Sequence, residues 1–381
     1  MQNKITTQGI IPSLNGLRAI SIVMVVGSHL QSKPSIHDSK FLRGIGYFIF
    51  NGGLGVNIFL VISGFLITKL LIDELTQTGT VSLRKFYLRR VIRIFPAYYF
   101  LLSVYFLLQL AGYFHINLLA WISVLTFTKQ FFINNTAELD HLWSLSVEEV
   151  FYLIWPFSFI NFKRRSIQIS VYIILLVAVI RIITTNFPAP SLSLTIFARA
   201  DALLIGSLIA IYYKQITQWV LARQWMIYLV VPVLLVSIFT YTYFFSRLSN
   251  SVGNEQVNYL LLRVAYGFLG SEGLVTNLLI GFIVVFSINV RNSWFWLLNT
   301  SIMNHLGKLS YSIYLWQQLF TADREVLNKM PIVVLLGIIY LIAYLSYEFI
   351  EKPFMSLKRK YNLEAGHPVA KEAKQDALVI R

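Results

Sequence analysis

The chain has 381 residues, of which 56% are hydrophobic and only 13% are charged. A soluble domain would carry roughly 25% charged residues, so the composition excludes an ordinary soluble fold and indicates an integral membrane protein. The sequence contains no cysteine, which excludes disulfides, thiolate nucleophiles and cysteine-ligated metals.

The formal net charge of +15 comes from basic residues gathered in short clusters between apolar runs, the clearest at 84–93, 163–165 and 358–360. Such clusters are typical of the cytoplasmic loops of a membrane protein under the positive-inside rule. Nucleic-acid binding would need an extended basic face. We therefore expect a lipid bilayer around this chain and no nucleic-acid partner.

Long, unpunctuated apolar runs predict the transmembrane helices. In chain order they cover residues 14–30, 45–72, 94–113, 141–159, 167–183, 194–213, 225–245, 274–288, 306–320 and 332–350. The first run lacks a small-residue cleavage site and Arg18 interrupts the approach to it, so we interpret it as a retained span and not as a signal peptide.

One further run, residues 118–132, is ambiguous because it is shorter than most spans. If it crossed the membrane, the basic residues 163–165 would face outward. If it is re-entrant or interfacial, all the basic clusters fall on the cytoplasmic side. The sequence therefore predicts an all-α, polytopic transmembrane helix bundle with about ten spans and both termini cytoplasmic, with eleven spans as the alternative.

The whole of residues 1–354 is expected to form one membrane-embedded domain, followed by a short polar cytoplasmic tail at 355–381. A tail of this length is too short to fold alone. The longest candidate for an outward loop covers residues 246–272. No internal repeat of the kind found in many transporters is present.

Arg18 and His29 lie eleven residues apart in the first span. At 100° per residue they return to nearly the same helix face, separated by about 16 Å along the axis. A fixed cation near the cytoplasmic end and a titratable imidazole above it suit a long anionic cofactor, with the histidine carrying out proton chemistry. The alternative is a snorkelling arginine and a packed histidine.

Two further pairs of charged residues lie at the starts of predicted spans. Glu148 and Glu149 point about 100° apart on a helix, so at most one of them faces a given site; helix capping by a nearby serine is the alternative. Arg199 and Asp201 pair with each other, or one of them contacts a ligand. A single residue such as Arg181 is interpreted as part of a structural pair in the bundle interior or as a snorkelling residue at the end of a span.

Arg89, Arg90 and Arg93 precede Pro96 at the inner start of the third span. Arginine there suits phosphate binding and equally suits lipid headgroups; the sequence alone favours the lipid. The glycines at 52, 53, 55 and 64 do not match a phosphate loop and indicate close helix packing. No nucleotide-binding glycine pattern or metal-ligand spacing is present.

Several segments together carry a family resemblance. They are LNGLR (14–18) with His29, GVNIFLVISGFLIT (55–68), FYLRRVIRIFP (86–96), HLWSLSVEE (141–149), RAD (199–201), LSYSIYLW (309–316) and EKPF (351–354). In this order they resemble the acyltransferase 3 family of membrane-bound acyltransferases, from Leu14 to Phe354. The first segment with His29 is similar to the family motif of an arginine, ten residues and a histidine.

Three features depart from the family pattern. Asn57 stands where the family often has aspartate, so no acidic role is required there. Gln317 stands where many relatives have histidine, which argues against a second catalytic imidazole at that position. Many relatives carry a C-terminal SGNH-type esterase domain that this sequence lacks, so we expect the chain to work alone or to pass its acyl group to a separate protein.

The resemblance implies transfer of an acyl group, usually acetyl, from cytoplasmic acyl-CoA to a hydroxyl of a cell-surface or exported glycan. Acyl-CoA is then a co-substrate, and no permanently bound cofactor is expected. The implied partners are the donor, a glycan or glycolipid acceptor and a protein of the glycan assembly pathway. The implied location is the bacterial inner membrane.

The resemblance also assigns roles. His29, Arg18 and Glu148 are the catalytic candidates. CoA phosphates would bind Arg18, Arg89, Arg90 and Arg93, and the acceptor would contact Glu148, Asp201 and Arg199. Two rival functions are a transporter or flippase of a glycan or lipid-linked substrate, whose charges line a permeation path, and a structural or sensory membrane protein. A transporter would release no free thiol from CoA.

Overall fold

The computed structural model describes residues 11–31, 33, 46, 50–132, 138–186, 199–236, 270 and 273–360. Every regular element in these ranges is helical, which confirms the all-α prediction. The longer helices are α1 (Leu14–Leu30), α4 (Gly52–Thr78), α5 (Leu83–Leu110), α7 (Trp143–Asn161), α8 (Lys163–Asn186), α13 (Leu274–Asn289), α15 (Ser301–Thr321) and α17 (Ile332–Ser346). The shorter ones are α6 (Leu118–Leu125), α9 (Ala200–Ile211), α10 (Tyr213–Ala222), α14 (Ser293–Leu298), α16 (Glu325–Asn328) and α18 (Lys352–Lys360).

Four irregular turns complete the described elements. Three are 3₁₀ turns, at Lys129–Phe131, Asp140–Leu142 and Gln224–Met226. The fourth is a π-helical turn, at Tyr347–Glu351. It precedes Pro353, whose ring lacks an N–H and would clash with the carbonyl four residues earlier, so a widened turn accommodates the proline inside a continuous helix.

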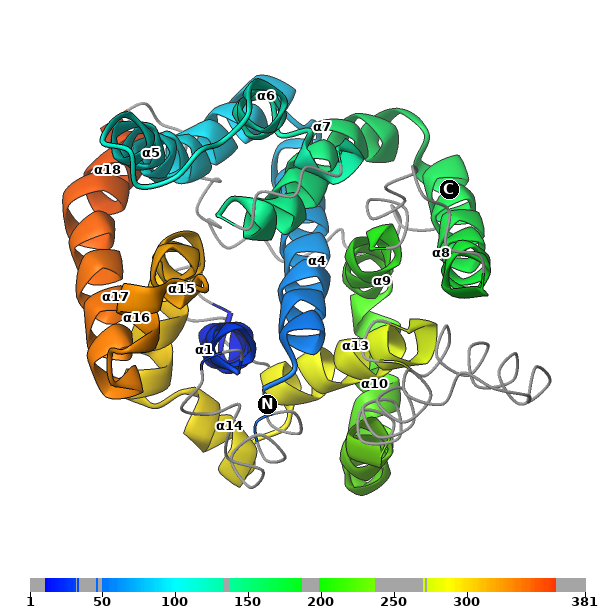
Figure 1. The fold of residues 1–381 in the computed structure, drawn as a ribbon. Helices are drawn as coiled ribbons and strands as arrows, with labels where there is room; N and C mark the ends of the chain where they lie inside the picture. Colours follow the sequence, from blue (N-terminus) through cyan, green and yellow to red (C-terminus); the bar gives the residue numbers. More distant parts are fainter. Residues whose placement is uncertain are drawn as a thin grey trace.

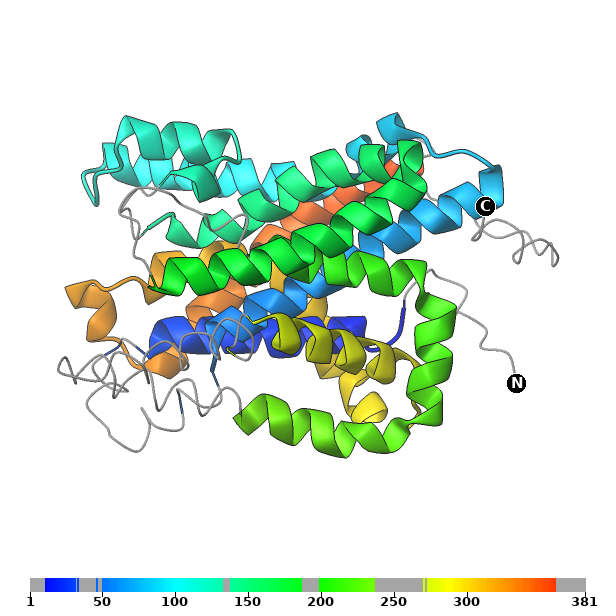
Figure 2. The ribbon, with the colours of Figure 1, turned by 90° about the vertical axis from the view of Figure 1, so that its right-hand side faces the viewer.

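The helices surround α1 and α4, with α15 on one side of this pair and α9 on the other (Figure 1). Seen from the side, α1, α4, α5 and α17 run roughly along one common direction (Figure 2). The start of α1, the connection from α4 to α5 and the end of α18 lie at the same end of the bundle, which we call the Arg18 end. The opposite end, where α1 finishes, is called the His29 end.

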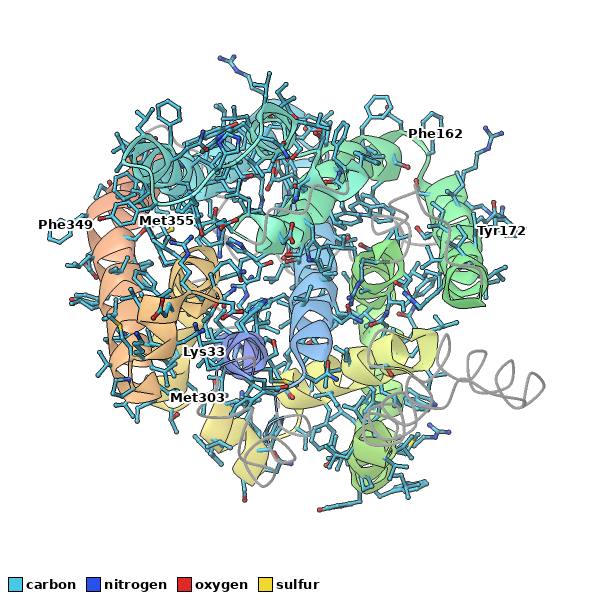
Figure 3. All side chains as sticks on the ribbon, viewed as in Figure 1. Lys33, Phe162, Tyr172, Met303, Phe349 and Met355 are labelled. Atoms are coloured by element: carbon cyan, nitrogen blue, oxygen red, sulfur yellow. The ribbon has the colours of Figure 1, made fainter. Side chains whose placement is uncertain are left out.

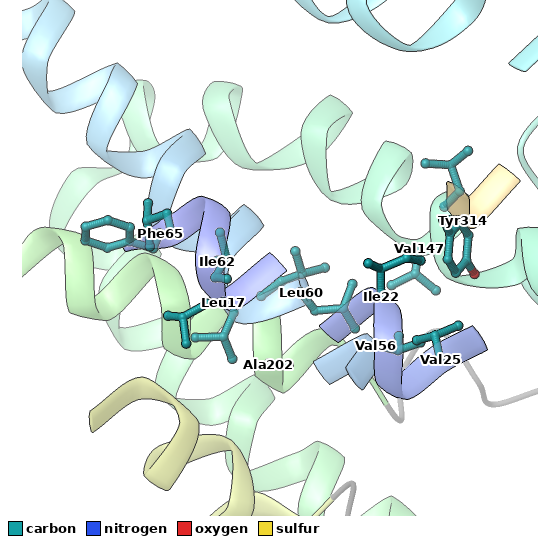
Figure 4. Close-up of a cluster of buried hydrophobic side chains, with 14 of the residues drawn as sticks. Leu17, Ile22, Val25, Val56, Leu60, Ile62, Phe65, Val147, Ala202 and Tyr314 are labelled. Carbon is teal, nitrogen blue, oxygen red and sulfur yellow. The ribbon is translucent and has the colours of Figure 1, made fainter. Parts of the chain in front are cut away.

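Apolar side chains cover both the inside and the outside of the bundle. Leu17, Ile22 and Val25 of α1 pack against Val56 and Leu60 of α4 in the buried core (Figure 4). On the periphery, the side chains of Tyr172 and Phe349 point outward (Figure 3) and are 70% and 75% exposed. Exposed apolar residues on this scale match a bilayer better than water.

Three helical stretches are long and apolar enough to cross a membrane, counting only the described residues: Gly52–Thr78, Leu83–Leu110 and Ile332–Leu357. A fourth exists if Tyr213–Ala222 and Gln224–Val236 are one broken span, because these two helices meet at 80°. The bundle is therefore a membrane protein, whereas ten spans, the cytoplasmic termini and the domain boundary stay predictions.

The ambiguous run at 118–132 contains only the eight-residue helix α6 and a 3₁₀ turn. A helix of this length rises about 12 Å, well short of a bilayer core. This observation favours the ten-span alternative over eleven.

The basic stretch at 84–93 was expected to be a loop, and this expectation is wrong. It forms the first turns of α5, because the Ser82 side chain caps the helix by accepting from the Lys85 N–H at 3.4 Å. At the other end of the chain α18 continues to Lys360, past the tail boundary at 354–355, which stays a prediction.

Other predicted boundaries are shifted or lie outside the described residues. The span expected to begin at residue 45 contains α4, which begins at Gly52. The Asn51 side chain caps this helix by accepting from the Leu54 N–H at 2.9 Å. Residues 194–198 and 237–245 of two predicted spans, most of the loop at 246–272 and residues 361–381 fall outside the described part.

Close helix contact at α4 and α9 depends on two glycines. A Cβ added to Gly206 would lie 2.1 Å from the Val61 carbonyl oxygen, and one added to Gly64 would lie 1.9 Å from the Leu203 carbonyl oxygen. Neither contact can be relieved by a side-chain rotation, because both neighbours are backbone. The prediction of tight packing at Gly64 is confirmed.

Replacing Gly206 with alanine is therefore expected to lower the free energy of unfolding by about 1–3 kcal/mol, as overpacking does. The matched control is Gly337→Ala in α17, where a Cβ would meet nothing within 4 Å. The check is the thermal midpoint of each variant in detergent. Equal midpoints for the two variants would contradict the role given to Gly206.

Candidate active site

The Arg18 end gathers charged side chains from three helices. Arg18 of α1 lies within electrostatic reach of Arg90 and Arg93 of α5 and of Glu148 and Tyr152 of α7. Tyr152 donates its hydroxyl hydrogen to Glu148 Oε2 at 2.6 Å. Five of the chemistry-bearing side chains in the sequence thus meet in one cluster, four of them predicted site residues.

Arg90 is held by two aromatic rings. Its guanidinium lies 5.6 Å from the ring centroids of both Phe86 and Tyr152. Its Nε is buried and has no hydrogen-bond partner in the part of the chain that the structure describes. Cation–π contacts of this kind orient a guanidinium while leaving its donors available for an anion.

Arg89 is held differently from its neighbours. Its Nη2 forms an ion pair of 2.7 Å with Glu74 of α4, and both side chains are only about one-tenth exposed. The other oxygen of Glu74 accepts from the Ser82 N–H at 2.9 Å. Arg89 therefore fastens the connection between α4 and α5, and its role in phosphate binding stays a prediction.

Glu351 is a further member of this end that the sequence did not single out as a site residue. It lies in the π-helical turn, is 5% exposed, and accepts a hydrogen bond from the Ser312 hydroxyl. Arg93 lies within its electrostatic reach. The signal in the sequence was a carboxylate directly after the last predicted span and directly before the Lys352-Pro353 pair.

The His29 imidazole lies at the other end of α1, on a helix that runs unbroken from Leu14 to Leu30. The ring is hydrogen-bonded to the side chain of Gln317 and to the backbone of Val25. The single helix confirms the spacing on which the pairing of Arg18 with His29 was predicted. Gln317, identified as a departure from the family, is fully buried beside the histidine.

A second imidazole lies close to the first. His141 and His29 interact electrostatically, and His141 Nε2 lies 3.2 Å from the carbonyl oxygen of Leu315. Tyr314 donates its hydroxyl hydrogen to the carbonyl oxygen of His141, and the Ser144 hydroxyl lies 2.6 Å from that of Tyr314. His141 and Tyr314 lie within the motifs that carry the family resemblance, but the sequence alone assigned a role to neither residue.

Arg199 and Asp201 belong to a buried polar network. Asp201 is paired with Arg181, whose Nη2 lies 3.1 Å from both carboxylate oxygens, and it accepts from Asn277 at 3.0 Å. Arg199 donates to Asn57 Oδ1 at 2.6 Å. The suggested pairing of Arg199 with Asp201 is therefore wrong, because Arg181 takes the carboxylate, and the structural pair expected for Arg181 is confirmed.

The same network explains Asn57. Its amide nitrogen donates to Asn277 Oδ1 at 2.8 Å while its oxygen accepts from Arg199. The Asn57 amide thus donates one hydrogen bond and accepts another at the same time, which a carboxylate could not do without protonation. Arg199 also stacks on Trp143, 5.2 Å from the ring centroid.

A sequence model of the acyltransferase domain matches residues 11–348. The chain belongs to this acyltransferase family. The match covers all the predicted site residues and the buried network, whereas Glu351 and α18 at the Arg18 end lie just beyond it.

Two curated relatives of this acyltransferase-family chain come from Staphylococcus aureus. O-acetyltransferase OatA of strain MRSA252 is 28% identical over 399 residues, covering 97% of this chain and 60% of the relative. OatA of strain NCTC 8325 / PS 47 is 28% identical over 372 residues, covering 90% of this chain and 57% of the relative. The chain thus spans about three-fifths of the length of these relatives. No solved structure matches the chain.

Proposed function

We propose that the protein is an O-acetyltransferase that moves an acetyl group from acyl-CoA to a hydroxyl of a glycan. One observation carries the proposal: Arg18, a member of the arginine cluster, and the His29 imidazole lie on the same helix, eleven residues apart, with polar partners at both ends. The names of the two relatives agree with this activity.

In the proposed mechanism the donor enters at the Arg18 end, with its phosphates at Arg18, Arg90 and Arg93. Guanidinium groups bind phosphate oxygens by bidentate, charge-assisted hydrogen bonds. Glu148, hydrogen-bonded to Tyr152, faces Arg18 and orients it. The basic residues at this end support a cytoplasmic orientation under the positive-inside rule.

At the His29 end, His29 takes the proton of the acceptor hydroxyl as its oxygen attacks the thioester carbonyl. The new C–O bond forms, the C–S bond breaks, and the proton passes to the CoA thiolate. The ring is held by the Gln317 side chain and the Val25 backbone, and its neutral form carries one nitrogen lone pair that takes the proton. An acyl-imidazole on His29 is the alternative route to the same products.

The acceptor is proposed to approach from the opposite side of the membrane, near Arg199. The stack of Arg199 on Trp143 and its hydrogen bond to Asn57 fix its position. The two oxygens of Asp201 are already engaged by Arg181 and Asn277, so Asp201 supports the acceptor region through this network. A bacterial inner membrane and a separate glycan-assembly protein complete the proposal.

The proposal is tested by thiol release from acetyl-CoA, using the full chain in nanodiscs with a pool of cell-envelope glycan fragments. We expect release that depends on the glycans. A folded protein that releases no thiol from acetyl-CoA or longer acyl-CoA, with the same pool, would support the rival function of a transporter or flippase.

Arg18→Ala is expected to raise the KM for acetyl-CoA by about 10- to 100-fold, because hydrogen bonds to charged groups contribute about 1.5–3 kcal/mol. The half-saturating glycan concentration should stay the same. Arg291→Ala is the matched control, since this exposed arginine stacks on Phe295 beside the start of α1 and lies outside the cluster. Steady-state kinetics on both substrates check the prediction, which an unchanged acetyl-CoA KM for Arg18→Ala would contradict.

A further inference from the structure

Among the buried polar atoms at the His29 end that lack hydrogen-bond partners within the described ranges, two belong to side chains that interact with His29. They are Nδ1 of His141, whose side chain is 4% exposed, and Nε2 of Gln317, which is fully buried. Buried polar atoms without a partner are rare in folded proteins, because each one forfeits its hydration. Each is therefore a place where a polar group of a bound molecule would gain a hydrogen bond.

The geometry of His141 makes its Nδ1 a hydrogen-bond acceptor. Its Nε2 lies 3.2 Å from the Leu315 carbonyl oxygen, which can only accept, so in the neutral ring Nε2 carries the hydrogen and Nδ1 the lone pair. The backbone beside the ring is held as well, because Tyr314 donates to the His141 carbonyl oxygen. The lone pair thus has a fixed direction.

The amide of Gln317 is oriented in the complementary sense. The Thr321 hydroxyl donates to Gln317 Oε1 at 3.4 Å, which identifies Oε1 as the acceptor and leaves Nε2 as a donor. The hydrogen bond between this side chain and the His29 ring also uses Oε1, since Nε2 has no partner. A buried donor therefore lies beside the imidazole assigned to the chemistry.

Both groups are anchored on one turn of α15. His141 is held by the carbonyl of Leu315, and Gln317 lies two residues further along the same helix. His29 and His141 also interact electrostatically. One acceptor and one donor therefore lie next to His29, and a sugar presents the matching pair of groups on neighbouring hydroxyls.

We propose that His141 and Gln317 form the acceptor subsite and select a sugar with two adjacent hydroxyls. This inference rests on the proposed function. The reacting hydroxyl gives its proton to His29 while its oxygen accepts from Gln317 Nε2. The neighbouring hydroxyl donates to His141 Nδ1 and keeps its proton throughout.

Two substitutions of His141 separate its two nitrogens. In His141→Gln the longer amide places an N–H where Nε2 lies, which keeps the bond to Leu315 and removes the Nδ1 acceptor. In His141→Asn the shorter amide places a polar atom where Nδ1 lies and loses the bond to Leu315. If His141 only stabilises the fold, His141→Gln should behave as the wild type does and His141→Asn should not.

The first measurement is the rise in thermal midpoint caused by the glycan-fragment pool, without any acyl-CoA. We expect a rise for the wild type and for His141→Asn, measured from its own lower starting midpoint. For His141→Gln we expect a normal starting midpoint and a roughly tenfold higher glycan concentration for the same rise. A wild-type response in His141→Gln, or no response in the wild type, overturns the subsite; the first result would assign the space to a buried water.

The second measurement is thiol release at varied glycan and acetyl-CoA concentrations. His141→Gln should raise the half-saturating glycan concentration about tenfold and leave the KM for acetyl-CoA unchanged. Thiol release with an unchanged glycan dependence would overturn the subsite and keep the proposed function. Glycan binding that needs His141, without thiol release from any acyl-CoA, would overturn the proposed function and keep the subsite.

Discussion

His29→Ala is expected to reduce glycan-dependent thiol release by about 10²- to 10⁴-fold, the usual contribution of a general base. The loss should appear in kcat, because the imidazole acts in the transition state and Arg18 still holds the donor. The route through an acyl-imidazole predicts a loss at least as large, since the nucleophile itself would be missing. Steady-state kinetics with acetyl-CoA and the glycan pool measure the effect.

The matched control is His305→Ala. This histidine lies on α15, is exposed, and contacts the Tyr340 hydroxyl at 3.0 Å on the outside of the bundle. It should retain full transfer, and both variants should elute and melt as the wild type does. Preserved transfer in a folded His29→Ala protein would refute the mechanism.

Asp201→Ala is expected to destabilise the bundle by about 3–5 kcal/mol, because it leaves the Arg181 charge buried without its carboxylate. Asp201 is fully buried and Arg181 only 4% exposed. The measurement is the thermal midpoint together with the yield of folded protein after detergent extraction. Loss of the Asp201 carboxylate should also disturb the position of Arg199, because hydrogen bonds through Asn277 and Asn57 connect Asp201 to Arg199.

Glu325→Ala provides the comparison for an ion pair in water. Its partner Lys329 is 2.6 Å away, and both side chains are more than 70% exposed. Exposed pairs contribute about 0–1 kcal/mol, so this variant should melt close to the wild type. A double variant, Arg181→Met with Asp201→Leu, should recover most of the lost stability because it removes both charges. Equal effects of Asp201→Ala and Glu325→Ala would contradict the buried network.

The sequence was sufficient wherever the site depends on spacing within one helix. Arg18 and His29 share a face of α1 because helical periodicity alone brings residues eleven apart into line. The same geometry predicted that at most one of the two adjacent carboxylates would serve a given contact, and the Tyr152 hydroxyl bonds to Glu148. The family resemblance, confirmed over residues 11–348, supplied the predicted activity and the other site residues.

The sequence was insufficient wherever hydrogen-bond or ion-pair partners come from helices that are distant in the chain. Asn57 and Asn277 are 220 residues apart in the chain, and nothing in their local sequence indicates that they touch. Arg181 was the nearer partner of Asp201 in space although Arg199 is nearer in sequence. Gln317 was interpreted only as the loss of a histidine, because its position beside His29 depends on how α15 packs along α1.

The packing of α1 also has a consequence for donor selection. Gly307 of α15 brings the two helices so close that an added Cβ would lie 2.0 Å from the Asn15 carbonyl oxygen, and α1 is unbroken from there to His29. In the proposed mechanism the helix is therefore a ruler of fixed length between the phosphates of the donor and the imidazole. Because the arm of CoA from phosphate to sulfur is the same for every thioester, we expect the ruler to deliver all of them to the same depth. Discrimination between acyl chains must then come from the room available beyond the thioester carbonyl, at the His29 end.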